Sequence, residues 1–223
     1  MSIAQFIDHT LLKNTATIAE IEQICNEAKE FEFATVCVPP YYVSDASQIL
    51  QDSKVKVCTV IGFPFGYHKY QTKVAEARQA LADGAHELDM VMNLAAFKSN
   101  DMAYLETEIN ELLKLTGEGS ALVKVIIESG ILSDEEIIRC CDLYKHFPVA
   151  FLKTSTGYAE KGATLEAVKI MRENLPSSIQ IKASGGIRSY DFAKQLIDAG
   201  ATRLGCSASV AIVQGEKAPE AGY

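Results

Sequence analysis

The chain has 223 residues, of which 48% are hydrophobic and 22% are charged, and its formal net charge is -8. This hydrophobic content supports a large core and argues against disorder. The basic residues are scattered, which argues against DNA, RNA or an anionic membrane as the main partner. The first residues lack the pattern of a signal peptide, and no apolar run approaches the roughly 18 residues that a membrane span requires. We therefore expect a cytoplasmic protein.

The six cysteines do not form the pattern of a disulfide framework. Some lie in apolar strand-like runs, Cys25 lies on a helix pattern, Cys140 and Cys141 are adjacent, and no C-x-x-C pair is present. We predict free cysteines that pack as small hydrophobic residues. For Cys37, the sequence offers no obvious histidine to activate the thiol, so packing is favoured over chemistry.

Strand-like and helix-like segments alternate along the chain. The predicted strands are short apolar or β-branched runs that end at turn residues, and they span 33–38, 55–61, 87–92, 122–127, 148–153, 179–182 and 202–207. The predicted helices have apolar residues at helical spacing, and they span 17–31, 44–52, 74–84, 104–115, 133–145, 164–174 and 189–199. Two of these helices start with a capping box, at Thr17 and Ser133.

This strict alternation with short connections predicts a parallel sheet. Seven βα units are clear, and the segment 7–10 would supply an eighth strand, the first in chain order. Eight units close the sheet into a barrel, whereas fewer leave an open doubly wound sheet. We predict an α/β protein with one domain, a (β/α)8 TIM barrel over residues 1–214, followed by a flexible polar tail over residues 215–223.

Two successive predicted strands end in a lysine that is followed by small residues. The first reads FLKTSTG at 151–157 and carries Lys153, and the second reads IKASGG at 181–186 and carries Lys182. An ammonium group is costly to bury without a partner, so each lysine is expected to face a cleft. A single lysine at a strand end more often simply reaches water, and the repeated pattern is what favours a functional site.

The two lysines are expected to project into one barrel mouth, where each disfavours the charge of the other. A neutral amine can attack a carbonyl group and form a Schiff base. Asp89 is the best candidate for the proton transfers, and a role as an ion-pair partner that balances the lysines is compatible with this. Lys124 and Glu128 share one strand parity and could pair inside the barrel, and we predict a structural role for both.

Glycine-rich turns follow the last two predicted strands. Gly185 and Gly186 come after the seventh strand, and Gly205 and Ser207 come at the end of the eighth. In such barrels a phosphate group is commonly bound over these two units, where glycines let backbone N–H groups approach an anion. Asp8 and Thr10 would enter the same mouth if the first strand exists. The histidines show no metal-ligand spacing, so we predict no metal and no cofactor.

At this point the chain resembles the deoxyribose-phosphate aldolases, a family of class I aldolases, over essentially its whole length. The resemblance rests on IDHTLL at 7–12, ELDMVMN at 87–93, KVIIESG at 124–130, FLKTSTG at 151–157 and IKASGGIR at 181–188. It implies a (β/α)8 barrel whose first strand is 7–10. It also implies the reversible cleavage of 2-deoxy-D-ribose 5-phosphate into acetaldehyde and D-glyceraldehyde 3-phosphate.

The resemblance also implies roles for single residues. Lys153 would form the Schiff base, Lys182 would perturb it, and Asp89 would transfer protons. The phosphate would be bound by Gly157, Gly185, Gly186, Gly205 and Ser207. A second serine often follows Ser207 and a lysine follows Gly157 in some members, where this chain has Ala208 and Tyr158; these departures bear on phosphate affinity. The family can end in a tyrosine that assists proton transfer, as Tyr223 would here.

Two other functions remain open from the sequence. One is a different Schiff-base aldolase on the same barrel that uses a ketone donor, and the other is a non-catalytic phosphosugar-binding barrel whose lysines only clamp an anion. The expected partners are small phosphosugars and aldehydes, with no nucleic acid and no membrane. A homodimer and a higher homo-oligomer are both left open.

Overall fold

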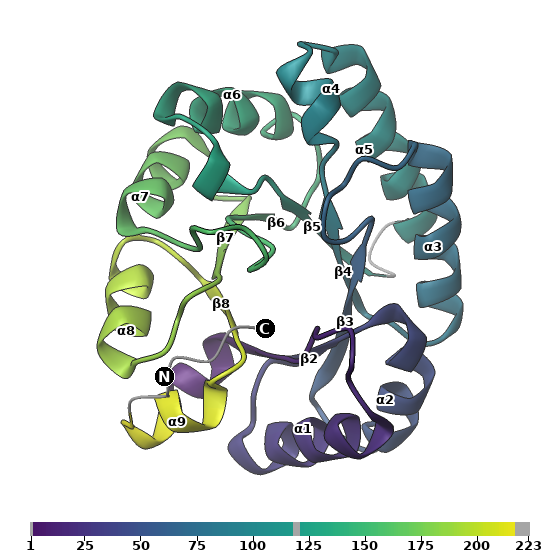
Figure 1. The fold of residues 1–223 in the computed structure, drawn as a ribbon, viewed down its shortest axis with the longest axis vertical. Coiled ribbons are helices and arrows are strands. Elements are labelled where there is room, and N and C mark those ends of the chain that lie inside the picture. Colours follow the sequence, from purple (N-terminus) through teal and green to yellow (C-terminus); the bar gives the residue numbers. More distant parts are fainter. Residues whose placement is uncertain (1, 118–120, 217–223) are drawn as a thin grey trace.

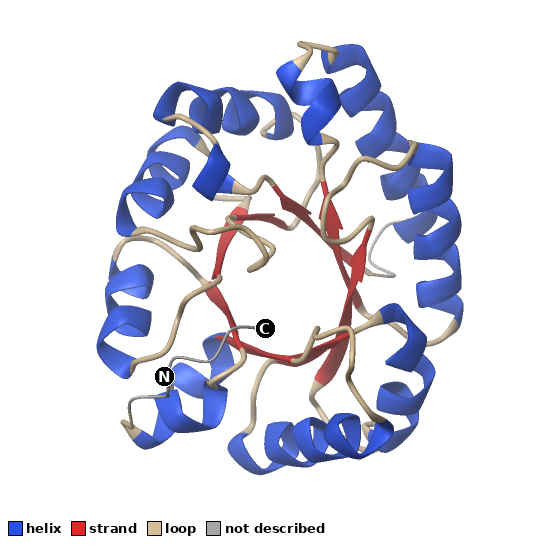
Figure 2. Cartoon of the chain, in the orientation of Figure 1, coloured by secondary structure: helices blue, strands red, loops and turns tan. Residues whose placement is uncertain are grey.

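The computed structural model describes residues 2–117 and 121–216, and these form a closed barrel of eight parallel strands inside a ring of helices (Figures 1 and 2). The strands pair in chain order, and β1 closes the barrel against β8. The predicted fold class is therefore confirmed. The predicted tail lies outside the described residues from 217 onward, and so does Tyr223.

The strands are short, as expected for a barrel that is covered on its outer face. They are β1 (Ile7–Thr10), β2 (Thr35–Val38), β3 (Lys56–Ile61), β4 (Glu87–Val91), β5 (Leu122–Ile126), β6 (Phe151–Lys153), β7 (Gln180–Ser184) and β8 (Arg203–Cys206). The predicted start of the second strand at Phe33 was wrong by two positions. Glu32 adopts a left-handed conformation and the N–H of Phe33 still bonds to Ala28, so these residues end the preceding helix.

The helices lie on the outside of the barrel and follow the strands in order (Figure 1). They are α1 (Ile18–Phe31), α2 (Val43–Ile49), α3 (Tyr70–Ala82), α4 (Leu94–Lys98), α5 (Met102–Thr116), α6 (Asp134–Tyr144), α7 (Leu165–Asn174), α8 (Tyr190–Asp198) and α9 (Ser209–Gln214), with short 3-10 turns at Ile3–Phe6, Pro40–Tyr42 and Ser129–Ile131. Both predicted capping boxes are present, at Thr17 with Glu20 and at Ser133 with Glu136. The short helices α4 and α9 were not predicted.

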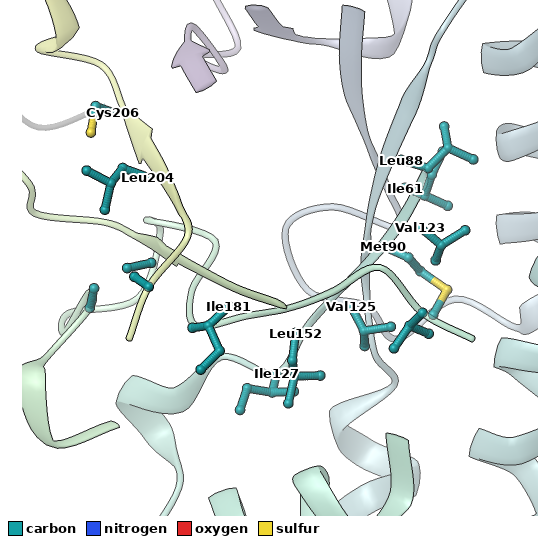
Figure 3. Packing of buried hydrophobic residues seen from close by; sticks show 14 of the residues in the cluster. Ile61, Leu88, Met90, Val123, Val125, Ile127, Leu152, Ile181, Leu204 and Cys206 are labelled. Carbon is teal, nitrogen blue, oxygen red and sulfur yellow. The ribbon is translucent and has the colours of Figure 1, made fainter. Parts of the chain in front are cut away.

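The two faces of the barrel strands differ in character. The residues that point outward toward the helices are apolar, and Leu88, Met90, Leu152 and Ile181 belong to this layer of the core (Figure 3). The alternate positions point toward the barrel axis, because successive side chains of a strand face opposite sides. Several of these inward positions carry charged side chains. No helix in the described part of the chain is long and apolar enough to cross a bilayer.

Candidate active site

Seven charged side chains meet inside the barrel. We refer to them as the barrel charge cluster, which consists of Asp8, Glu87, Asp89, Lys124, Lys153, Lys182 and Arg203. They come from six different strands, so the closure of the barrel is what brings them together. The cluster contains one more cation than carboxylates, which makes it suited to an anionic substrate.

Lys153 and Lys182 share a single carboxylate oxygen. The Lys153 Nζ lies 2.8 Å from the Asp89 Oδ2, and the Lys182 Nζ lies 2.7 Å from the same atom. The two lysines are register partners on β6 and β7, while Asp89 reaches them from β4. The structure thus brings together the three residues that the sequence singled out. Lys153 is 3% exposed, at the end of its strand, and Lys182 is completely buried.

Lys124 makes further ion pairs beside Asp89. The Lys124 Nζ lies 2.7 Å from the Asp89 Oδ1 and 2.5 Å from the Glu87 Oε2. Lys124 therefore does not pair with Glu128, and that prediction was wrong. Glu128 follows the end of β5 with a φ of 55°, and its side chain accepts hydrogen bonds from the N–H and the hydroxyl of Thr156.

Asp8 lies at the centre of the other contacts. Its carboxylate accepts a hydrogen bond from Lys182, and its Oδ1 lies 2.6 Å from a guanidinium nitrogen of Arg203. Asp8 was predicted to enter the mouth and bind substrate. The structure places it in the cluster with no exposed surface, where it holds Lys182.

The electrostatic environment keeps Asp89 and Lys182 ionised. Burial raises the pKa of Asp89, but the attraction of Lys124, Lys153 and Lys182 outweighs it and holds the pKa well below its usual range. Burial also lowers the pKa of Lys182, but Asp8 and Asp89 outweigh this effect, so its pKa lies above the usual range. Lys182 is therefore a permanent cation at physiological pH.

The glycine-rich turns meet above the ends of β6 and β7. Gly157, Gly185 and Gly186 all have positive φ values, of 91°, 86° and 77°, which favour glycine. A Cβ on Gly185 would lie 3.4 Å from the Cα of Gly157, so these two turns are in contact. A Cβ on Gly186 would meet no atom within 4 Å, so its backbone borders open space. Figure 1 shows the chain after β6 bending toward the barrel axis.

Gly205 and Ser207 lie in different surroundings. Gly205 belongs to β8, and a Cβ there would lie 2.9 Å from the side chain of Ser184 and 3.2 Å from the Cε of Lys182. Its missing side chain leaves the space that Lys182 occupies. Ser207 is exposed and, with Thr10, lines a cavity of about 330 Å³ between the top of β1, α1 and α9.

Potential metal ligands also lie inside the barrel. The donor atoms of Cys37, Cys58 and Asp89 lie within 4.8 Å of one another, as do those of Asp8, Cys58 and Glu87. Their carboxylates already bind ammonium or guanidinium groups, and these surrounding cations disfavour a metal ion.

Several members of the barrel charge cluster were not predicted from the sequence. Arg203 and Glu87 were not singled out, and Lys124 was paired with the wrong carboxylate. The strand parity held a usable signal, because Glu87 and Asp89 are two positions apart and therefore face the same side. It could have indicated that Glu87 shares the barrel interior with Asp89. The partner on a distant strand could not be read from this parity.

Comparison with known proteins agrees with this geometry. The profile described as DeoC/LacD family aldolase matches residues 2–215. A protein named deoxyribose-phosphate aldolase from Caldanaerobacter subterraneus subsp. tengcongensis is 50% identical over 215 residues, covering 96% of this chain and 93% of the relative. One of the same name from Clostridium novyi is 46% identical over all 223 residues and the full length of both chains.

A solved structure described as a tetrameric deoxyribose phosphate aldolase from Aeropyrum pernix aligns with a TM-score of 0.88 at 33% identity, covering 95% of this chain and 89% of the other. The parallel barrel, the lysine pair inside it and the match to an aldolase family together define an aldolase, which is a carbon–carbon lyase. The chain belongs to the DeoC/LacD family of aldolases.

Proposed function

We propose that this chain is a class I aldolase that reversibly cleaves 2-deoxy-D-ribose 5-phosphate into acetaldehyde and D-glyceraldehyde 3-phosphate, in the breakdown of deoxyribose phosphates. The observation that carries the proposal is the pair of lysines that share one oxygen of Asp89 on the barrel axis. The names of the relatives near 50% identity support the choice of substrate.

Lys153 is the nucleophile in this proposal. It stands at the end of β6, nearer to the mouth than the fully buried Lys182, and the glycine turns begin just after it. The Lys153 Nζ, as a neutral amine, attacks C1 of the open-chain sugar, and water leaves as the imine forms. Asp89 touches the same nitrogen at 2.8 Å and accepts and returns the protons of these steps.

The imine then serves as an electron sink. The C2–C3 bond of the sugar breaks, its electron pair forms an enamine on Lys153, and the C3 hydroxyl group loses its proton to become the aldehyde of glyceraldehyde 3-phosphate. Protonation of the enamine carbon and hydrolysis release acetaldehyde. Lys182 remains a cation beside the reacting nitrogen, and a neighbouring positive charge disfavours the charged form of an amine.

In this proposal the substrate phosphate binds over the glycine-rich turns. The backbone of Gly157, Gly185 and Gly186 borders the mouth, and backbone N–H groups in such turns bind anions. Ser207 is proposed to contribute its hydroxyl group from the neighbouring turn, and Thr10 lies beside it. Gly205 and Asp8 would act indirectly, by giving room to Lys182 and by holding it. A role of Tyr223 in proton transfer remains a prediction from the sequence.

We also infer a homo-oligomer and a cytoplasmic location. The inference of an oligomer is supported by the tetramer described for the relative from Aeropyrum pernix. Analytical ultracentrifugation would test it, and sedimentation as a single protomer at micromolar concentration would contradict it.

The central experiment traps the covalent intermediate. The protein is mixed with acetaldehyde and borohydride, digested and analysed by mass spectrometry, and we expect a reduced two-carbon adduct on Lys153. The Lys153→Leu variant should form no adduct and should not cleave 2-deoxyribose 5-phosphate. Lys169→Leu is the matched control, because Lys169 is an exposed lysine on α7, and this variant should behave like the parent protein.

Three outcomes would contradict the proposal. An adduct on Lys182 would reverse the assignment of the two lysines. Trapping with a ketone donor in place of acetaldehyde would indicate a different Schiff-base aldolase. The absence of any adduct would indicate a barrel that only binds a phosphosugar.

A further inference from the structure

Two cysteines face each other inside the barrel and have no role in the proposed reaction. Cys37 on β2 and Cys58 on β3 are register partners on neighbouring strands, and both are completely buried. Their sulfur atoms lie within 4.8 Å of each other. Both point toward the axis, since Val36 and Val57, at the adjacent strand positions, belong to the outer core.

This arrangement is compatible with a disulfide bond. Neighbouring strands lie roughly 4.8 Å apart, and the Cα atoms of a disulfide are usually about 4.4 to 6.8 Å apart. The backbone at Cys37 and Cys58 therefore already has the spacing that a disulfide requires. A modest movement of the side chains is enough to join the two sulfur atoms.

Cys37 differs from the other cysteines in the direction of its pKa shift. The neighbouring Cys58 thiol lowers the pKa of Cys37, burial and the charge of Asp89 raise it, and the charges of Lys182 and Lys153 lower it. Burial raises the pKa of all the other thiols, which are those of Cys25, Cys58, Cys140, Cys141 and Cys206. The sequence offered no histidine to activate Cys37, but the fold supplies lysines instead.

We propose that Cys37 and Cys58 are an oxidation site: a peroxide that enters the barrel converts them into a disulfide bond, and this cross-link reversibly slows the aldolase reaction. The Cys37 thiolate attacks one oxygen of hydrogen peroxide, the O–O bond breaks, and the hydroxide that leaves takes up a proton to become water. The thiol of Cys58 then attacks the sulfur of the resulting sulfenic acid, and a second water leaves. Each cysteine is oxidised by one electron, and the peroxide is reduced to two waters.

The oxidant has a route to the site. Cys37 and Cys58 form a small cluster with Leu12 and Val60, and the partly buried Phe63 packs against it. Lys153 is 3% exposed. Under the proposed function, the barrel mouth must still admit a substrate to this lysine. Hydrogen peroxide is close to water in size, so the opening that admits the sugar also admits it.

The cross-link changes a contact of the proposed catalytic carboxylate. The Sγ of Cys58 lies 3.2 Å from the Asp89 Oδ1 and 3.3 Å from the Lys124 Nζ. A disulfide removes the thiol proton, and with it the hydrogen bond that Cys58 donates to Asp89. It also draws the sulfur toward β2 and away from these groups. The expected effect on turnover and the route of the oxidant rest on the proposed function, whereas the pairing of the two cysteines does not.

The experiment oxidises the parent protein with hydrogen peroxide in the absence of a reductant. Free thiols are then blocked, and the protein is digested without reduction and analysed by mass spectrometry. We expect a peptide pair joined through Cys37 and Cys58, an intact mass lower by two hydrogen atoms, and a loss of turnover of about tenfold or more. Dithiothreitol should restore both the mass and the activity.

Two variants make the result specific. Cys58→Ala cannot form the cross-link, so Cys37 should instead accumulate as a sulfenic acid that dimedone captures. Cys25→Ala is the matched control, because Cys25 is a buried cysteine on α1 outside the barrel, and this variant should form the cross-link like the parent. A dimedone adduct on another cysteine in Cys58→Ala would overturn the assignment of the reactive thiol.

The remaining outcomes separate the two parts of the proposal. Two unmodified cysteines in the oxidised parent, or a link to a different cysteine, would refute the oxidation site. A complete cross-link with unchanged turnover would refute its effect on the reaction. An untreated protein that does not cleave 2-deoxyribose 5-phosphate would contradict the proposed function, while the cross-link would still be decided by mass.

Discussion

Lys73 and Glu108 form a buried ion pair between α3 and α5, whereas Lys153 and Lys182 share Asp89 within a network of charges inside the barrel. We call the first the isolated pair because it lies apart from the barrel charge cluster, although Glu76 also attracts Lys73. For the isolated pair, burial outweighs the attraction of the partner: it lowers the pKa of Lys73 and raises the pKa of Glu108. In the barrel the balance is the opposite, because attraction lowers the pKa of Asp89 and raises that of Lys182 despite burial.

The difference lies in the number of partners. Glu108 faces one ammonium group at 2.7 Å, while Asp89 faces three, from Lys124, Lys153 and Lys182. One ammonium group does not fully offset the loss of hydration of the Glu108 carboxylate, whereas three ammonium groups do so for Asp89. The isolated pair also binds the backbone, because the Lys73 ammonium group donates a hydrogen bond to the carbonyl of Val91 at 2.7 Å. The barrel network keeps Asp89 and Lys182 ionised beside Lys153.

Asp89→Asn should have the largest effect on activity. The amide cannot carry the transferred proton or balance the lysines, so turnover of 2-deoxyribose 5-phosphate should fall by about 10³-fold or more. Glu108→Gln makes the same chemical change in the isolated pair and should lower turnover by less than about fivefold. Steady-state kinetics of both variants check this. Equal losses in the two variants would mean that the network has no special role.

Lys182→Leu should have the next largest effect. Without the neighbouring cation, Lys153 holds its proton more strongly beside Asp89, so the imine should form only at higher pH. We expect turnover at neutral pH to fall by roughly 10- to 100-fold. Borohydride trapping at a series of pH values measures the shift. Lys182→Arg keeps the charge but enlarges the group, so it should lower the rate with a smaller shift. An unchanged pH profile in Lys182→Leu would contradict the role of its charge.

Lys73→Met should affect stability more than activity. It leaves Glu108 buried without its partner, and the free energy of unfolding should fall by about 3 to 5 kcal/mol. The double variant Lys73→Met/Glu108→Leu should recover part of this loss. Urea denaturation measures both. A loss below about 1 kcal/mol in the single variant would show that the pair contributes little.

The same variant has a defined pH dependence. The pKa of Glu108 in the folded protein already lies above its usual value of 4.5, and the loss of Lys73 removes an attraction that lowers it. A carboxyl group whose folded pKa is raised destabilises the fold once it ionises. The deficit of Lys73→Met should therefore be greatest above the folded pKa of Glu108 and should shrink as the pH falls toward 4.5. A deficit that grows with acidification would contradict this.

Tyr158→Phe should have the smallest effect. It measures how much one neutral hydrogen bond contributes to the free energy of unfolding. The Tyr158 hydroxyl donates to the carbonyl of Leu12 at 2.9 Å, and its ring packs edge-on against Phe63. Loss of the hydroxyl should lower the free energy of unfolding by about 0.5 to 1.5 kcal/mol. The turn that carries Gly157 should become less well held, so KM should rise about twofold with little change in kcat. A larger effect on kcat than on KM would place Tyr158 closer to the chemistry.

Much of this architecture could be predicted from the sequence. The alternation of elements predicts the barrel, and the repeated strand-end lysines predict the meeting of Lys153 and Lys182. The first strand was harder, because Asp8, His9 and Thr10 interrupt its apolar pattern, and the family resemblance settled it. The inward residues of a barrel strand can be polar when other strands supply partners for them. Such a strand lacks a continuous apolar run, so it is hard to predict from its own sequence.

Other features depend on register, which the sequence does not reveal. The pairing of Cys37 with Cys58 follows from the alignment of β2 and β3. The separation of Lys124 from Glu128 follows from the positive φ of Glu128 just beyond β5. The need for Gly205 depends on the path of the Lys182 side chain across β8.

Asp8 and Arg203 are 195 positions apart in the chain, and their contact joins the first strand to the last. Until β8 docks against β1, Asp8 lacks its guanidinium partner and the barrel interior stays open to water on that side. Docking of β8 adds the charge of Arg203 to that of Lys182 beside Asp8 and closes the barrel wall, so the carboxylate is buried only as its ion pairs are completed. The charges that the proposed reaction uses are therefore brought together only when the barrel is complete. Neither half of the chain contains all the residues of the barrel charge cluster.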